Sequence, residues 1–203
     1  MAVDSERVAE LVRELLLAIG EDPDRPGLRN TPARVAEAYI EFFGGIDRDP
    51  AEQLGQTISV ARGPAPDTLS SGAVILRDVR FRSICEHHLL PFRGRAHICY
   101  LPGEQVVGLG ALPRALDVLA SRPQVQERLG EQLADTLASA LDARGVLVIL
   151  DAEHDCVSAR GARHVDASTV TIAARGELAE PAARAELIAL IGSGVPRTGE
   201  DER

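Results

Sequence analysis

The hydrophobic pattern of this chain changes its period close to residue 73, and this change restricts the fold more than any other feature. Before it, apolar residues recur every three to four positions over 6–19 and 31–43, which predicts two helices. Beyond it, short apolar runs with partial alternation predict strands. The predicted strands cover residues 73–84, 94–102, 145–157 and 165–176.

Two further helices complete the predicted secondary structure. One long helix is expected over 112–143, between the two pairs of strands, and a last helix over 181–191. Because helices and strands are segregated along the chain, we predict an α+β fold with helices on one face of a four-stranded antiparallel sheet. The expected organisation is a helical arm and linker over 1–72, a catalytic domain over 73–192 and a flexible tail over 193–203.

Composition and charge exclude several classes of function. The 203 residues carry 22 basic and 31 acidic side chains, a formal net charge of −9, so a general nucleic-acid or anionic-membrane binder is not expected. No apolar run reaches the roughly 18–20 residues that span a bilayer. The first ten residues show no secretory pattern, and the three cysteines are too few for a disulfide framework. Free thiols in a reducing cytoplasm are therefore expected.

A thiol and an imidazole stand at metal-ligand spacing at the end of the first predicted strand. Cys85 and His88 form a C-x-x-H pair, in which a thiolate and an imidazole can converge on one ion. A third ligand would come from an H-x-C pair, whose two side chains share one side of a strand. The chain has two such pairs, His97 with Cys99 and His154 with Cys156. Spacing alone leaves the choice open, and both pairs could equally be ordinary parts of the sheet.

Three protein ligands would leave one position of a zinc ion open, which is the catalytic rather than the structural pattern. Zinc lowers the pKa of bound water toward ~7 and so supplies hydroxide at neutral pH. His87, and the histidine of whichever H-x-C pair contributes its cysteine, would then be candidates for proton transfer.

Two other polar features could bind a substrate. The run over 124–128 is either a solvated helix face or the place where a Glu carboxylate accepts two N–H groups of a guanine-like edge. Arg160, which follows the second H-x-C pair, is either an ordinary loop residue or an anion clamp beside the metal.

Several motifs together resemble the GTP cyclohydrolase I family. The chain reads CEHHLLPFRGRAHICYLP from residue 85, VVGL from 106, RPQVQERL from 122 and HDCVSARGARH from 154. The N-terminal ELLLAIGEDPDRPGLRNTPARVAEAY is similar to that family's helical arm. The resemblance covers about residues 6–192.

The resemblance implies a tunnelling fold, a zinc cofactor and a guanine-type substrate. Members of the family hydrolyse the imidazole ring at C8, release formate and close dihydroneopterin triphosphate after an Amadori rearrangement of the ribose. Their subunits form a homodecamer of two stacked rings, with active sites between subunits. A cytoplasmic homo-oligomer, most simply a decamer, without nucleic-acid or membrane partners is therefore expected.

The resemblance also implies roles for individual residues, carried over by position. The implied zinc ligands are Cys85, His88 and Cys156, so the second H-x-C pair is selected and Cys99 is left as a strand residue. The implied catalytic histidines are His87 and His154. The implied purine-binding positions are Gln126 and Glu127, and the arginines implied to face the triphosphate are Arg34, Arg114 and Arg160.

Two departures from the family pattern concern the phosphates. Where the family usually has Ser-Lys after Gly-Leu, this chain has Gly110 and Ala111, and Glu37 stands where some members have a phosphate-facing lysine. Each charge-assisted contact is worth roughly 1.5–3 kcal/mol. We therefore expect a zinc-dependent cyclohydrolase that opens the ring of a guanine compound with fewer phosphates than GTP. The alternatives are an ordinary GTP cyclohydrolase I and a catalytically silent family member that binds a purine.

Overall fold

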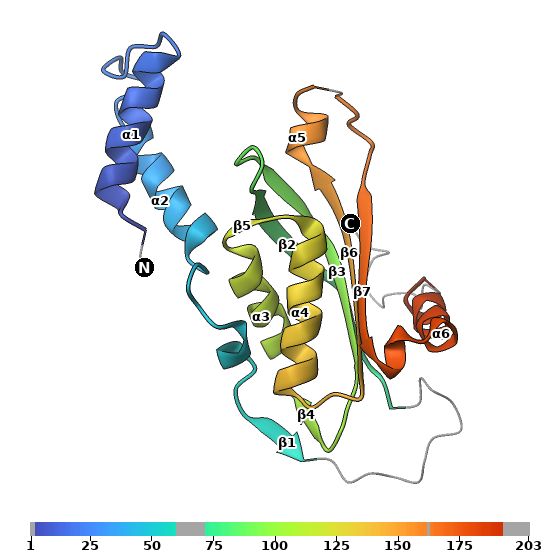
Figure 1. Ribbon diagram of the computed structural model, residues 1–203. Helices are drawn as coiled ribbons and strands as arrows, with labels where there is room; N and C mark the ends of the chain where they lie inside the picture. The colour runs from blue at the N-terminus through green and yellow to red at the C-terminus, as the bar shows by residue number, and fades with distance from the viewer. Residues whose placement is uncertain (1–2, 60–71, 162, 193–203) are drawn as a thin grey trace, which may run out of the picture.

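The computed structural model describes residues 3–59, 72–161 and 163–192, which fold around a twisted sheet (Figure 1). The strand order is β5-β2-β3-β6-β7. Four long strands pair antiparallel: β2 (Val74–Cys85), β3 (Pro91–Leu101), β6 (Gly145–His154) and β7 (Thr169–Gly176). The α+β class is confirmed. The predicted count of four strands is wrong, because the two-residue β5 (Pro123–Gln124) pairs in parallel with the end of β2.

The predicted long helix is in fact two helices with β5 between them. α3 (Ala111–Ala120) and α4 (Gln126–Ala140) are separated by Pro123, which lacks the N–H that a helix interior needs and would clash with the preceding turn. Gln124 instead pairs with Cys85 at the end of β2. A two-residue strand that contains proline has no periodicity, so the sequence pattern gave no sign of it.

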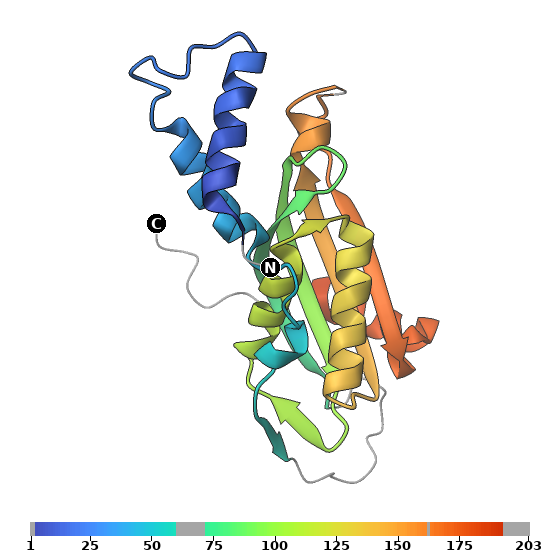
Figure 2. The same cartoon turned by 60° about the vertical axis from the view of Figure 1, so that its left-hand side comes forward.

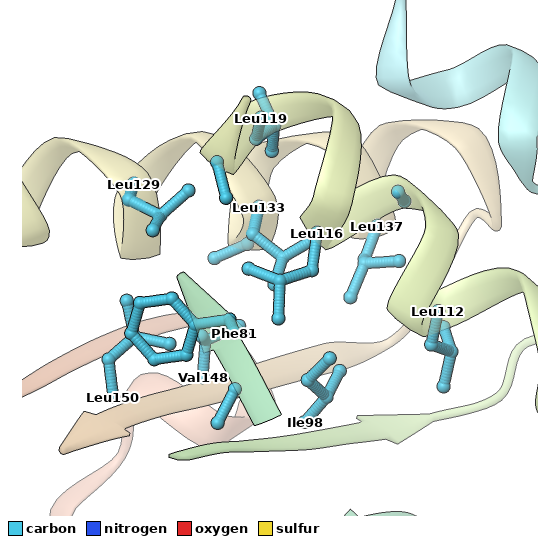
Figure 3. Packing of buried hydrophobic residues seen from close by; sticks show 14 of the residues in the cluster. Phe81, Ile98, Leu112, Leu116, Leu119, Leu129, Leu133, Leu137, Val148 and Leu150 are labelled. Atoms are coloured by element: carbon cyan, nitrogen blue, oxygen red, sulfur yellow. The ribbon is translucent and has the colours of Figure 1, made fainter. Parts of the chain in front are cut away.

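The main core lies between the sheet and helices α3 and α4 (Figure 3). Val148 and Leu150 alternate on one face of β6 and are fully buried, as are Leu116 on α3 and Leu133 on α4. Burying a leucine or valine side chain stabilises the fold by about 1.5–3 kcal/mol. This packing fixes the ends of β2 and β6, where the candidate ligands lie.

Helices cover both faces of the sheet, so the expectation of one covered face is wrong. A short 3-10 turn, η2 (Glu177–Ala179), leads to α6 (Pro181–Gly192) on the face opposite α3 and α4. Leu178 and Leu187 pack there against Cys99 and Leu147. A second core therefore fills one end of that face.

The two N-terminal helices are confirmed as α1 (Ser5–Ala18) and α2 (Thr31–Phe43), and they form a hairpin beside the sheet (Figure 2). The hairpin joins the sheet domain at Gly45, whose N–H donates to the Ser121 carbonyl at 2.8 Å. A Cβ at this position would lie 2.0 Å from the Val118 carbonyl oxygen, so only glycine permits the approach. Arg82 on β2 adds an ion pair with Glu41 at 2.9 Å.

The predicted linker contains structure of its own. A 3-10 turn, η1 (Pro50–Gln53), precedes β1 (Thr57–Ser59), which pairs antiparallel with β4 (Gln105–Val107) in a separate two-stranded sheet. Residues 60–71 and the predicted tail over 193–203 lie outside the described residues. None of the helices in the described part of the chain is long and apolar enough to cross a membrane.

Candidate metal centre and active site

Cys85, His88 and Cys156 come together at one end of the sheet. Cys85 ends β2, His88 lies in the turn to β3, and Cys156 lies in the one-turn helix α5 (Asp155–Ser158) that follows β6. Two backbone hydrogen bonds make the turn tight. The Cys85 N–H donates to the Leu90 carbonyl at 2.8 Å, and the Cys85 carbonyl accepts from the Leu89 N–H at 2.9 Å. The potential ligand atoms of the three residues all lie within 4.8 Å of one another.

The donor set fits zinc. Two thiolates and an imidazole are ligands that zinc favours, and bonds of 2.0–2.3 Å in a tetrahedral site place ligand atoms roughly 3.3–3.8 Å apart. The pKa of the Cys156 thiol is raised, first by burial and then by the neighbouring Cys85. A cation between the two sulfurs would remove this mutual penalty, since a coordinating thiol is deprotonated.

The other H-x-C pair is part of the sheet. Cys99 is 0% exposed in the second core, and burial raises the pKa of its thiol to about 12. It lies eight residues along β3 from Pro91, which at ~3.3 Å per residue is about 26 Å from the end of the sheet where Cys85 lies. His97 accepts the Asp78 N–H at Nδ1, 3.3 Å away. The structure therefore brings only Cys156 of the two candidates to Cys85 and His88.

A network of hydrogen bonds and an ion pair, which the sequence did not predict, holds the turn between β2 and β3 that carries His88. We call this segment the ligand turn. Glu86 N–H donates to the Gln124 carbonyl at 2.9 Å, and the Glu86 carboxylate pairs with Arg128 on α4. Arg128 Nε donates to Gln124 Oε1 at 3.1 Å, and Gln124 Nε2 donates to Gln132 Oε1 at 2.8 Å. The short β5 thus ties the C-x-x-H turn to the first turns of α4. Only its place in the RPQVQERL motif marked this segment in the sequence.

His154 ends β6 two residues before Cys156 and is held on two sides. Its ring stacks on Phe92 with a centroid distance of 4.6 Å and an interplanar angle of 4°. Its Nε2 lies 2.8 Å from Gln126 Oε1. Burial lowers the pKa of His154, and the Glu127 carboxylate partly offsets this. A neutral imidazole is therefore favoured here. His87 is exposed in the ligand turn, with its ring 6.3 Å from that of His88.

The two residues implied to bind the purine point in different directions. Gln126 is 1% exposed and its amide is engaged inside the protein. Glu127, the next residue, is exposed in the first turn of α4 and lines a cavity of about 220 Å³. The other lining residues are Gly130, Glu131, Thr171, Ile172 and Ala173. This cavity lies between α4 and β7, the outermost strand of the sheet.

The arginines implied to face phosphate lie on three different elements of the chain. The charge of Arg160 slightly offsets the rise that burial and Cys85 cause in the pKa of Cys156, so Arg160 lies near the candidate metal centre. Arg114 is in the first turn of α3, about 9 Å along the helix axis from the end that leads to β5. Its Nη2 is 3.5 Å from the Gln53 carbonyl. Arg34 is exposed in the first turn of α2, on the helical arm, and Glu37 is exposed on the same helix.

Comparisons with known proteins agree on one family. The model of the family described as GTP cyclohydrolase I matches residues 8–192. A GTP cyclohydrolase 1 from Leifsonia xyli subsp. xyli is 61% identical over 191 residues, which cover 94% of this chain and 97% of that protein. A GTP cyclohydrolase 1 from Streptomyces griseus subsp. griseus is 48% identical over 192 residues, 94% of this chain and 92% of that protein.

Among solved structures, an archaeosine synthase QueF-Like protein in the apo form aligns with 52% of this chain and 94% of its own, at a TM-score of 0.42 and 16% identity. That likeness is too low to carry a statement about the fold. The family match and the relatives each extend over nearly the whole chain. The chain therefore belongs to the GTP cyclohydrolase I family, whose members are hydrolases that act on cyclic amidine C–N bonds.

Proposed function

We propose that this protein is a GTP cyclohydrolase I that hydrolyses the guanine ring of GTP at C8 and yields formate and 7,8-dihydroneopterin triphosphate. The observation that carries the proposal is the convergence of Cys85, His88 and Cys156 beside His154 in a chain of this family. Relatives named GTP cyclohydrolase 1 reach 61% identity over nearly the full length. They favour the ordinary reaction over the preference for fewer phosphates that Gly110, Ala111 and Glu37 led us to expect.

Zinc is the cofactor that this donor set suits, and Cys85, His88 and Cys156 would hold it. When bound, zinc lowers the pKa of a coordinated water toward ~7 and so supplies the nucleophile at neutral pH. The remaining chemistry is proton transfer and substrate orientation, which fall to the residues around the centre.

His154 and His87 are the proposed proton carriers. The low pKa of His154 keeps its ring neutral near pH 7, so it can accept a proton, and the Phe92 stack holds the plane of the ring. Glu127 is the proposed acceptor for the two N–H groups of a 2-amino-6-oxo purine edge, as charge-assisted hydrogen bonds. A purine without that pair of donors would leave the Glu127 carboxylate unpaired, which is a strong basis for rejection.

The phosphate side is proposed to be shared between subunits of a tunnelling-fold ring. Arg160 would come from the chain that holds the metal, and Arg34 and Arg114 from neighbouring chains. Two features of the single chain support an assembly. Leu15 and Ile19, on and after α1, are 58% and 66% exposed. Ile172 is 48% exposed on β7, which is the edge strand of the sheet among the described residues. Open sheet edges and clustered apolar side chains are usually covered in soluble proteins.

We predict that light scattering of the purified protein gives a large closed oligomer, most simply a decamer with a mass near ten times 21.7 kDa. Covering the β7 edge and the apolar residues of the arm is the physical reason. Replacing Ile172 by lysine, which adds a charge to the edge, should shift the distribution toward smaller species. A wild-type monomer at micromolar concentration would contradict the shared site.

The experiment that tests the function is parallel incubation of zinc-loaded protein with GTP, GMP, guanosine and guanine, with formate release and pterin absorbance read together. We expect GTP to have the highest kcat/KM. Arg160→Gln should lower kcat/KM for GTP by roughly 10- to 150-fold, the equivalent of one charge-assisted contact of about 1.5–3 kcal/mol, and leave guanosine nearly unaffected. A wild-type preference for GMP or guanosine would instead support the phosphate-poor alternative, and no formate from any of the four would support a silent protein.

A further inference from the structure

We infer that Gln126 is a positioning residue whose buried amide holds His154 as the Nε2–H tautomer and leaves Nδ1 as the ring atom that exchanges the proton. The assignment of the tautomer rests on hydrogen bonds within this chain alone. Its consequence for catalysis rests on the proposed function.

The orientation of the Gln126 amide follows from its neighbours. Gln126 Nε2 lies 3.0 Å from the Leu150 carbonyl oxygen, 2.8 Å from the Thr169 carbonyl oxygen and 3.2 Å from Thr171 Oγ1. Backbone carbonyl oxygens only accept hydrogen bonds, so the donor end of the amide must face them. A rotated amide would set Oε1 against two carbonyl oxygens in a site that is 1% exposed. The acceptor Oε1 is thereby directed at His154.

The amide oxygen then determines which nitrogen of His154 carries the proton. Gln126 Oε1 accepts but cannot donate, and it lies 2.8 Å from His154 Nε2. The hydrogen bond therefore forms only when Nε2 carries an N–H, whatever the charge of the ring. In the neutral ring, Nδ1 then carries the lone pair. The stack on Phe92 fixes the plane of the ring, so Nε2 and Gln126 Oε1 stay aligned.

The adjacent residues Gln126 and Glu127 therefore have different roles. Consecutive side chains on an α-helix point about 100° apart. Glu127 therefore lines the open cavity while Gln126 lies beneath it, over the paired strands β6 and β7. Both ends of the Gln126 amide are engaged inside the protein and the residue is 1% exposed, so the side chain is not presented to a purine. Its contribution to the reaction acts through His154, as a residue that sets the tautomer of a functional histidine.

The test compares two variants in the full-length, zinc-loaded protein. Gln126→Met keeps an unbranched side chain of similar length but removes the acceptor, whereas Thr171→Val removes one partner of Nε2 and keeps the contact with His154. Nitrogen-15 spectra of protein labelled at its five histidines report the tautomer, with His154 identified by the signal that is lost in His154→Asn. Zinc content and circular dichroism check that each variant is folded and loaded.

In the wild type and in Thr171→Val, we expect His154 to be protonated on Nε2 and bare on Nδ1. Gln126→Met should lose this pattern. It should also lower kcat for GTP by about 10- to 100-fold, the range found for partners that orient a histidine at a metal site. We expect KM to change by less than about threefold. Glu127→Gln should act in the opposite way and raise KM. This split between kcat and KM separates positioning from purine binding.

A proton on Nδ1 in the wild type would overturn the inference whatever the variants do, and this measurement does not depend on Gln126→Met folding. A raised KM with an unchanged tautomer in Gln126→Met would assign Gln126 to the purine instead. If the wild type releases no formate from GTP, the proposed function fails, but the nitrogen-15 pattern still decides the tautomer.

Discussion

Cys156→Ala is expected to remove zinc from the protein and to abolish formate release from GTP, whereas Cys99→Ala keeps both. The ligand atoms of Cys85, His88 and Cys156 lie within 4.8 Å of one another, and loss of one thiolate leaves only two protein ligands for an ion that needs at least three. Metal analysis of the purified variants is the direct measurement, and we expect about one zinc per subunit to fall close to none.

Cys99→Ala is a matched control for this experiment. Each cysteine follows a histidine by two residues, and each substitution removes one sulfur. Cys99 is the more deeply buried of the two, so its loss should cost at least as much stability through packing. A loss of zinc in Cys99→Ala with retention in Cys156→Ala would show that the centre is assembled from the other H-x-C pair.

The choice between these pairs illustrates what the sequence could predict. The ligand types and the C-x-x-H spacing were readable, because two side chains three residues apart in a turn can reach one ion. The third ligand was not readable from spacing, since both H-x-C pairs present the same local pattern. The two pairs differ in their place in the sheet. Cys99 lies on the face covered by α6, about 26 Å along β3 from the end of the sheet where Cys85 lies. The family resemblance selected Cys156 without that information.

The fold likewise has features that the sequence predicts and features that it does not. The helices of the arm and the long strands follow from periodic apolar patterns, and they were predicted to within a few residues. The break at Pro123 was readable from the proline itself, which a helix interior does not tolerate. The strand β5 was missed because its hydrogen bonds join segments far apart in the chain, Gln124 with Cys85 and with the Glu86 turn. Those bonds decide how α4 lies against the ligand turn. They therefore decide where Gln126 and Glu127 point, which no helical pattern could predict.

The proposed phosphate side of the site draws on three different elements of the chain. Arg34, Arg114 and Arg160 were named together from the resemblance, yet they lie on the arm, on α3 and beyond α5. In the proposed assembly, neighbouring subunits would bring them together. The effect of Gly110 and Ala111 on substrate choice would depend on that assembled surface, and the relatives named GTP cyclohydrolase 1 favour the ordinary reaction.

His154→Ala is expected to lower formate release from GTP by about 10²–10⁴-fold while zinc and fold are retained. A positioned general acid or base contributes rate enhancement of this size. The substitution leaves the three proposed zinc ligands in place. Cys85 ends β2, His88 lies in the turn that follows, and Cys156 lies on α5. Formate release at saturating GTP, with metal content and thermal unfolding measured on the same samples, checks each part of this prediction.

His97→Ala is the control that makes the comparison sharp. His97 has the same H-x-C context and is also partly buried, but its ring accepts the Asp78 N–H and lies six residues along β3 from Pro91, which at ~3.3 Å per residue is about 20 Å from the end of the sheet that carries the metal centre. Its loss should leave the rate within a few-fold of the wild type. The two variants would then differ by at least about tenfold although both remove an imidazole from a strand. If His154→Ala kept zinc and also kept the rate of His97→Ala, proton transfer would have to be assigned to His87, the other histidine that borders the ligand turn.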